Sequence, residues 1–185
     1  NGIVDNFKPV KVSTNSEASA YLKERKPKLS RSAADAVDRY TGDSFVETNR
    51  KLRSGESSDP EVKRLDAAMK PLPDDLLVRR RRGMEAFGVS SPEELEKLKG
   101  QIYSDPAYMS TSIGTPYGGD LGGVTLLLAV PKGTPGVLAA EYSRNPSERE
   151  ILIGRGQRMV ITSVKKNDRF GYNVSAVIVP EGTGE

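Results

Sequence analysis

Residues 124–130 read Val-Thr-Leu-Leu-Leu-Ala-Val, an almost unbroken apolar run that points to a strand inside a packed sheet. The chain around it contains more short apolar segments, separated by turns rich in glycine and proline such as Pro131-Lys132-Gly133. The second half of the chain is therefore expected to be rich in β-structure. We expect further strands at residues 76–78, 137–139, 150–153, 158–164 and 174–179.

The first 70 residues have a different pattern, because their apolar side chains recur at helical spacing. Thr41-Gly42 is expected to end one helix, and Asp59-Pro60 to begin another as N-cap and first helical position. We expect helices at residues 16–26, 30–40, 44–53, from 60 onward and 91–100. Helices followed by strands indicate an α+β fold, and no strand is followed by the Gly-x-Gly-x-x-Gly of dinucleotide-binding folds.

Composition excludes several kinds of chemistry. The 185 residues include no cysteine and no histidine, so disulfides, cysteine nucleophiles, Ser-His-Asp triads and Cys/His zinc sites are ruled out. No segment approaches the roughly 18 apolar residues of a membrane span. We expect one domain over residues 1–185, helical at about 10–70 and sheet-rich at 74–180. Because the chain begins at Asn1 without Met, we expect it to be a fragment of a longer polypeptide.

Two carboxylates stand at the start of an apolar strand, in Glu148-Arg149-Glu150. In an extended segment residues i and i+2 share a face, so Glu148 and Glu150 are expected to project together while Arg149 points away. Mutual repulsion then raises the pKa of one carboxyl group and separates their roles. The alternative interpretation is an ordinary charged strand edge.

Two further clusters carry polar chemistry. Ser110-Thr111-Ser112 is either a hydroxyl-rich site or a capped turn or strand edge. Residues 79–82 are four arginines that directly continue an expected strand, so alternate side chains point in opposite directions. One or two of them can face a cleft and bind phosphate through the forked guanidinium, or the run can be a solvated patch.

Taken in order, these segments resemble the arginine–serine–glutamate (R-S-E) clade of mono-ADP-ribosyltransferases, and most of all its toxin-type members, which include binary actin-modifying toxins. The resemblance runs from about Tyr40 to the C-terminus. It is carried by Tyr40-Thr41-Gly42 with Asn49 and Leu52-Arg53, by residues 76–83 with Phe87-Gly88, and by residues 108–112, 130–133 and 148–152. The resemblance implies two packed, mostly antiparallel β-sheets that form an NAD cleft, preceded by a helical N-terminal layer.

The resemblance also implies a reaction and roles for residues. ADP-ribose passes from NAD to a protein side chain and nicotinamide is released, without a metal. Glu150 would hold the ribose and stabilise the positive charge that develops on it, as in glycoside hydrolysis. Ser110 would orient Glu150 and touch the ribose, with Thr111 and Ser112 beside it in the NAD site. Arg80 would bind the NAD phosphates.

Glu148 would serve the acceptor. Relatives with Glu at this place modify arginine, and a guanidinium, whose pKa is above about 12, needs a carboxylate to position it and take its proton. We therefore expect an arginine on a target protein, with actin one candidate. Two departures from the family pattern concern the loop at residues 114–123 and the target-reading position Asn145. The loop contains Tyr117, a candidate for stacking on nicotinamide, but no arginine, so Arg81 or another basic residue is expected to make the second phosphate contact.

The same resemblance predicts a secreted or injected toxin or effector that acts in the cytosol of a target cell, with a delivery component or an antidote protein as further partners. Two other functions stay open. An NAD glycohydrolase would use water as the acceptor, although hydrolysis has no need of Glu148. A non-catalytic module would use the arginine run to bind an acidic partner or nucleic acid, but a net charge of +3 argues against nucleic acid.

Overall fold

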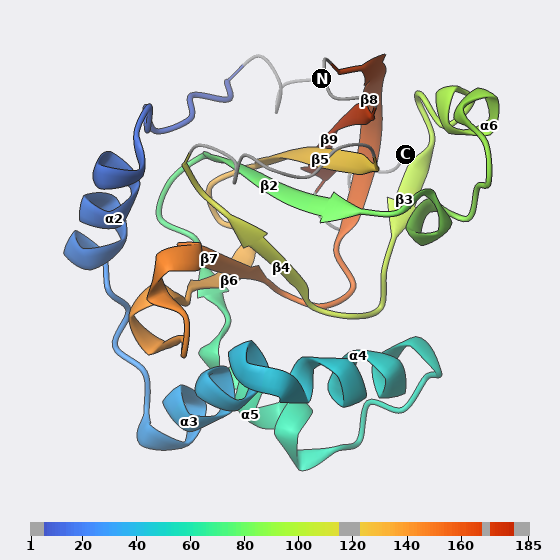
Figure 1. The fold of residues 1–185 in the computed structure, drawn as a ribbon. Helices are drawn as coiled ribbons and strands as arrows, with labels where there is room; N and C mark the ends of the chain where they lie inside the picture. Colours follow the sequence, from blue (N-terminus) through green and yellow to red (C-terminus); the bar gives the residue numbers. More distant parts are fainter. Residues whose placement is uncertain (1–5, 115–122, 168–170, 180–185) are drawn as a thin grey trace.

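A computed structural model describes residues 6–114, 123–167 and 171–179 of the chain (Figure 1). Helices come first and strands follow, so the α+β class is confirmed. In chain order the elements are α2 (Asn15–Glu24), α3 (Arg31–Arg39), the π-helix η1 (Tyr40–Ser44), α4 (Phe45–Arg53), α5 (Pro60–Ala68), β1 (Lys70–Pro71), β2 (Leu76–Arg82), the 3-10 helix η2 (Met84–Phe87), α6 (Pro92–Glu96), β3 (Ile102–Ser104), β4 (Met109–Ser112), β5 (Val124–Val130), β6 (Pro135–Leu138), the 3-10 helices η3 (Ala140–Tyr142) and η4 (Pro146–Glu148), β7 (Glu150–Ile153), β8 (Arg158–Lys166) and β9 (Tyr172–Val179).

The helices begin at polar capping residues. The Thr14 and Ser30 hydroxyls each accept a hydrogen bond from the backbone N–H three residues later, at the starts of α2 and α3. Asp59 caps α5 and Pro60 occupies its first turn, as the sequence predicts. These side-chain oxygens satisfy N–H groups that a helix cannot pair internally.

The prediction that Thr41-Gly42 ends a helix is wrong. The chain passes from α3 through η1 into α4 without leaving a helical path. A Cβ atom at Gly42 would lie 2.5 Å from Nη1 of Arg144, so a larger residue there would displace this exposed and flexible side chain. The wide turn of η1 places the Tyr40 side chain, 2% exposed, in the core beside Tyr108.

Within the described ranges nine strands form one hydrogen-bonded sheet, in the order β1-β6-β7-β4-β2-β5-β9-β8-β3. Only β5 and β9 are parallel neighbours among the described pairs. Strands β2 and β4 share a single paired position, Arg79 opposite Ser112, whereas the pairing of β2 with β5 extends along the whole of β2. The two expected sheets are therefore present as two halves, β1-β6-β7-β4 and β2-β5-β9-β8-β3, joined by one residue pair.

The core consists of two apolar clusters. Figure 1 shows α3, α4 and α5 grouped beside the half that contains β4, β6 and β7, with α2 along one side and α6 near β3. Val37 of α3 and Leu65 of α5 pack in one cluster with Tyr108 and Leu152. The other cluster contains the inward-facing residues of β2, β5 and β9. This second cluster also contains Met109 of β4 and Ile153 of β7, so it extends across the junction of β2 with β4.

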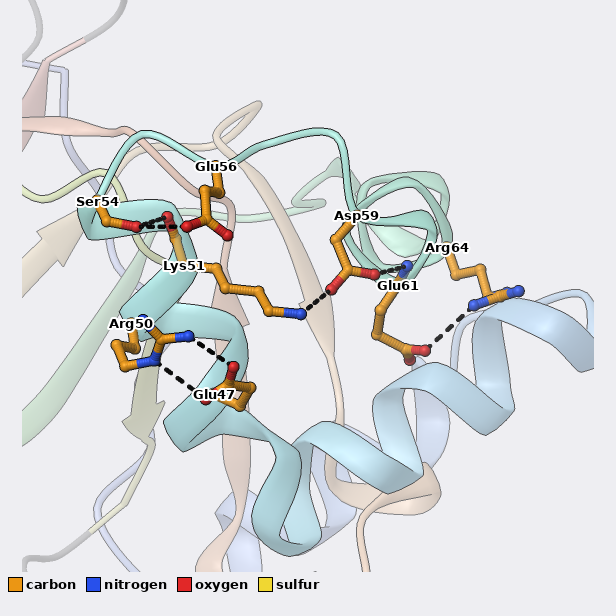
Figure 2. Close-up of polar contacts among 8 residues, drawn as sticks. All are labelled: Glu47, Arg50, Lys51, Ser54, Glu56, Asp59, Glu61 and Arg64. Carbon is orange, nitrogen blue, oxygen red and sulfur yellow. Dashed lines mark hydrogen bonds and ion pairs between the residues drawn. The ribbon is translucent and has the colours of Figure 1, made fainter.

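Surface ion pairs connect α4 to the start of α5 (Figure 2). The Lys51 ammonium lies 3.0 Å from Asp59 Oδ2, and Asp59 also accepts the backbone N–H of Glu61 at 2.9 Å. Within α4, Arg50 pairs with Glu47 at 2.7 Å. Ion pairs exposed to solvent contribute little to stability, so the cap by Asp59 matters more than the ion pairs around it.

Candidate active site

Glu150 is a buried carboxylate at the first position of β7. Its side chain belongs to a residue that is only 3% exposed, and it receives a hydrogen bond from Ser110 on the neighbouring strand β4. The Oε2 atom of Glu150 is buried and has no hydrogen-bond partner. Burial raises the pKa of Glu150 to about 7; the Glu148 charge adds to this rise, while Ser110 and Arg80 oppose it.

Glu148 lies in a 3-10 helix, whereas the sequence predicted an extended segment. It ends the 3-10 helix η4 and is exposed, so Glu148 and Glu150 are not on one pleat of a strand. Between them Arg149 adopts a left-handed conformation with φ 49°, which turns the chain into β7. Arg149, which was expected to point away from the two carboxylates, is buried at 8% exposure. Its Nε donates to the Ile113 carbonyl at 3.0 Å, and its Nη1 donates to that of Ser147 at 2.8 Å.

The hydroxyl cluster of β4 is divided between two faces of the strand. Ser112 is paired with Glu150 across β4 and β7, and Ser110 lies two residues earlier on the same face. Thr111 faces the other way and is buried, with its hydroxyl donating to the Ile151 carbonyl at 2.6 Å. The structure therefore brings Ser110 and Ser112, but not the Thr111 hydroxyl, to the side of Glu150.

Arg80 links β2 to the same site. Its Nη1 donates to the Ser110 carbonyl at 2.7 Å, which places its guanidinium beside β4, the strand whose Ser110 hydroxyl is hydrogen-bonded to Glu150. Its Nε is buried without a hydrogen-bond partner. The pKa of Arg80 is lowered, first by burial and then by the nearby charges of Arg82 and Arg53. Alternation along β2 leaves Arg79 and Arg81 more exposed than Arg80 and Arg82.

A cavity of about 560 Å³ continues the site away from β7. Its walls include the predicted residues Arg80 and Arg81, together with Arg53 and Asp105, which sequence reasoning did not assign to the site. Arg53 makes a two-pronged contact with the Asp105 carboxylate, Nε to Oδ1 at 3.1 Å and Nη2 to Oδ2 at 2.9 Å. The available signal for Arg53 was its place in the Leu52-Arg53 segment of the resemblance.

Tyr40 and Asn49 are buried residues of the helical layer, and Tyr40 is close enough to Arg80 and Glu150 to be influenced by their charges. Asn49 Nδ2 donates to the Tyr40 hydroxyl at 2.9 Å. Burial is the main cause that raises the pKa of Tyr40 to about 12, and the charges of Arg80 and Glu150 both act on this group. The segment that carried the resemblance through Tyr40 therefore lies next to Arg80 and Glu150.

The described residues contain six buried side-chain nitrogen or oxygen atoms without a hydrogen-bond partner, and four of them belong to Arg80, Arg82 and Glu150. Buried polar groups are normally satisfied, so this concentration indicates a site prepared for a polar ligand. Tyr117, the predicted stacking residue, lies outside the described residues. Within the described ranges there is no cluster of three or more potential metal-ligating side chains, and no helix is long and apolar enough to cross a membrane.

Solved structures define the class of this fold. The chain is similar to the Clostridium limosum C3 exoenzyme, with TM-score 0.80 and 20% identity over 96% of this chain and 100% of that one. It is also similar to Plx2a, an ADP-ribosyltransferase toxin from Paenibacillus larvae, with TM-score 0.77 and 19% identity over 90% of this chain and 96% of that one. The chain is similar as well to C3stau2 from S. aureus, which was solved with NAD. The TM-score is 0.73, with 20% identity over 94% of this chain and 100% of that one. The expected ADP-ribosyltransferase fold is confirmed.

The model of the ADP-ribosyltransferase exoenzyme family matches residues 15–179. Because this match spans most of the chain, the chain belongs to the ADP-ribosyltransferase exoenzyme family. The comparison with curated proteins found no match.

Proposed function

We propose that this protein transfers ADP-ribose from NAD to an arginine side chain of a target protein and releases nicotinamide. The observation that carries the proposal is the buried Glu150 carboxylate, which is hydrogen-bonded by Ser110 and influenced by the charges of Arg80 and Glu148. The family membership and the presence of NAD in the C3stau2 structure support the same donor substrate.

The residues of the site fit the parts of NAD. Arg80 has a buried, unpaired Nε beside the arginine-lined cavity, which suits a phosphate group. Ser110 and the unpaired Oε2 of Glu150 offer a hydroxyl and an acceptor to the ribose next to nicotinamide. These groups come from β2, β4 and β7, so a rigid sheet positions them before the substrate arrives.

Glu150 performs its work as a fixed negative charge. Cleavage of the bond between the ribose and nicotinamide sends the electron pair to nicotinamide, which leaves as a neutral molecule, and positive charge develops on the ribose. A preorganised carboxylate in a site with little water stabilises that charge more strongly than it would in solution. Ser110 keeps the carboxylate oriented, and its hydrogen bond also favours the ionised form that the reaction needs.

Glu148 handles the acceptor. It is exposed at the end of η4, where a side chain of another protein can reach it. The carboxylate binds the guanidinium of the acceptor, and it takes one proton as a nitrogen forms the new bond to the ribose. The product is an ADP-ribosylated arginine.

The toxin names of the structural relatives also support a cellular role. Plx2a and the C. perfringens enterotoxin component BECa are described as ADP-ribosylating toxins. We propose that this protein likewise leaves the cell that makes it and modifies a protein inside a target cell.

The test is to measure nicotinamide release from NAD, with and without agmatine as an arginine mimic, and to detect ADP-ribosyl-agmatine by mass spectrometry. Release that increases with agmatine and yields the adduct supports the proposal. Release without adduct would overturn the arginine assignment in favour of hydrolysis or another acceptor. No release by folded protein would overturn the transferase assignment.

A further inference from the structure

Arg82 is a buried arginine to which the proposed function gives no role. Its side chain is 6% exposed, and two of its nitrogen atoms, Nε and Nη2, are buried without a hydrogen-bond partner. A guanidinium that leaves water without replacing its hydrogen bonds is destabilising, so such an arrangement needs a reason. The side chain lines the 560 Å³ cavity, so a ligand in this cavity can reach it.

A structural role explains little of this burial. Arg82 Nη1 donates to the Tyr103 hydroxyl at 3.3 Å and lies 3.7 Å from Asp105 Oδ2, which are both long contacts. Asp105 has stronger partners than Arg82, because its oxygens accept from Arg53 at 3.1 and 2.9 Å and from the Ala107 N–H at 3.0 Å. The charge of Arg82 is the last of the causes that lower the pKa of Asp105, after those of Arg53 and Ala107. Removal of Arg82 would leave both of its neighbours with other partners, since Tyr103 also donates to the Ala86 carbonyl.

The charge around Arg82 favours an anion. Arg80 and Arg82 are residues i and i+2 of β2, so their side chains leave the strand on the same face, about 7 Å apart. Arg80 also has an unpaired buried Nε, and the cavity is lined in addition by Arg53 and Arg81. Against four guanidinium groups the lining has two carboxylates, Asp105 and Glu85, and Arg53 already engages the first of them. The cavity is therefore electropositive and contains donors that an anion would satisfy.

We propose that Arg82 binds the pyrophosphate bridge of the dinucleotide, acting with Arg80 as a second guanidinium fork. The inference rests on the proposed function for the identity of the dinucleotide. Two forks on one strand face suit a group with two adjacent negative charges better than a single carboxylate. Arg82 contacts a part of the substrate that is unchanged by the reaction, so it contributes equally to binding the ground state and the transition state.

The test compares Arg82→Met with Arg79→Met, a matched change on the same strand at an exposed arginine that does not line the cavity. Titration calorimetry measures the Kd for ADP-ribose and for inorganic pyrophosphate, steady-state kinetics give KM and kcat for nicotinamide release, and thermal scans give the unfolding midpoint without ligand. We expect R82M to weaken both Kd values and raise KM by roughly 10- to 100-fold, as expected for charge-assisted hydrogen bonds. Its kcat should stay within about twofold, its midpoint should not fall, and R79M should match the wild type.

Unchanged binding of ADP-ribose and pyrophosphate by R82M would overturn the inference. If the unfolding midpoint also fell while binding was unchanged, Arg82 would be a structural residue. If R82M does not fold, Arg82→Gln keeps a donor for Tyr103 and serves the same comparison. The pyrophosphate titration separates this inference from the proposed function, because it needs no transfer chemistry. Loss of pyrophosphate binding in R82M, together with a wild type that releases no nicotinamide, would support the anion site and reject the transferase.

Discussion

Glu150 and Glu148 are two residues apart in the chain, yet the fold gives them opposite surroundings. Glu150 lies at the start of a strand, buried at 3% exposure and hydrogen-bonded by Ser110. Glu148 ends a short 3-10 helix and is exposed. The left-handed turn at Arg149 separates them. The comparison shows how one short segment can bury one carboxylate and leave a second one, two residues away, accessible at the surface.

The largest effect is expected from Glu150→Gln, which keeps the size of the side chain and removes its charge. Nicotinamide release should fall by about 10²- to 10³-fold, with or without agmatine, because no other carboxylate takes the place of Glu150. Release is measured by chromatography, and the Kd for ADP-ribose serves as the control for an intact site. A folded E150Q protein that retained wild-type release would show that the buried carboxylate is not the catalytic charge.

The second effect concerns the exposed member of the pair. Glu148→Gln should lower ADP-ribosyl-agmatine formation by about 100-fold, since an amide cannot take the acceptor proton. Release of nicotinamide into water should change by less than about threefold, because that reaction needs no guanidinium. Glu141→Gln, at another exposed carboxylate nearby in η3, is the matched control. Equal losses of transfer and hydrolysis would contradict the division of labour between Glu148 and Glu150.

Local sequence pattern predicted those parts of the fold that local forces determine. Strand β7 begins at Glu150 and ends at Ile153 as expected, and α5 begins after Asp59, because apolar periodicity and capping act over a few residues. Strands β1 and β3 were not predicted. They are two and three residues long and are strands only because distant partners pair with them, as β8 does with β3.

The candidate site was predictable as a set of residue types but not as a geometry. The resemblance selected Glu150, Ser110 and Arg80, and the structure brings these three together. The assumption of an extended segment at Glu148 failed because a left-handed Arg149 has no local signal; two hydrogen bonds from its side chain hold it. Arg53 was missed as a cavity residue because its partner Asp105 is 52 positions away in the chain.

The turn itself can be tested by a pair of variants at Arg149. Arg149→Ala loses the hydrogen bonds to Ile113 and Ser147 and keeps the unfavourable positive φ. Arg149→Gly loses the same bonds but adopts that φ without a Cβ penalty. We expect both to be destabilised in urea unfolding, with R149G more stable than R149A by about 1 kcal/mol. In both variants the rate of ADP-ribosyl-agmatine formation should fall more than the rate of NAD hydrolysis, because the turn positions Glu148. A more stable R149A would show that the backbone at this position is not left-handed in solution.

The smallest effect is a change in pH dependence. Burial raises the pKa of Glu150 to about 7, and catalysis needs the ionised form, so kcat/KM for nicotinamide release should rise with pH and level off above about 7. The charge of Glu148 raises this pKa and the hydrogen bond from Ser110 lowers it, so the midpoint should move to lower pH in Glu148→Gln and to higher pH in Ser110→Ala. Ser112→Ala, a serine on the same strand that is not among the causes of the shift, is the control for the direction of movement. Midpoints that moved in the same direction in E148Q and S110A would mean that the titrating group is not Glu150, because these two neighbours act on its carboxyl group with opposite sign.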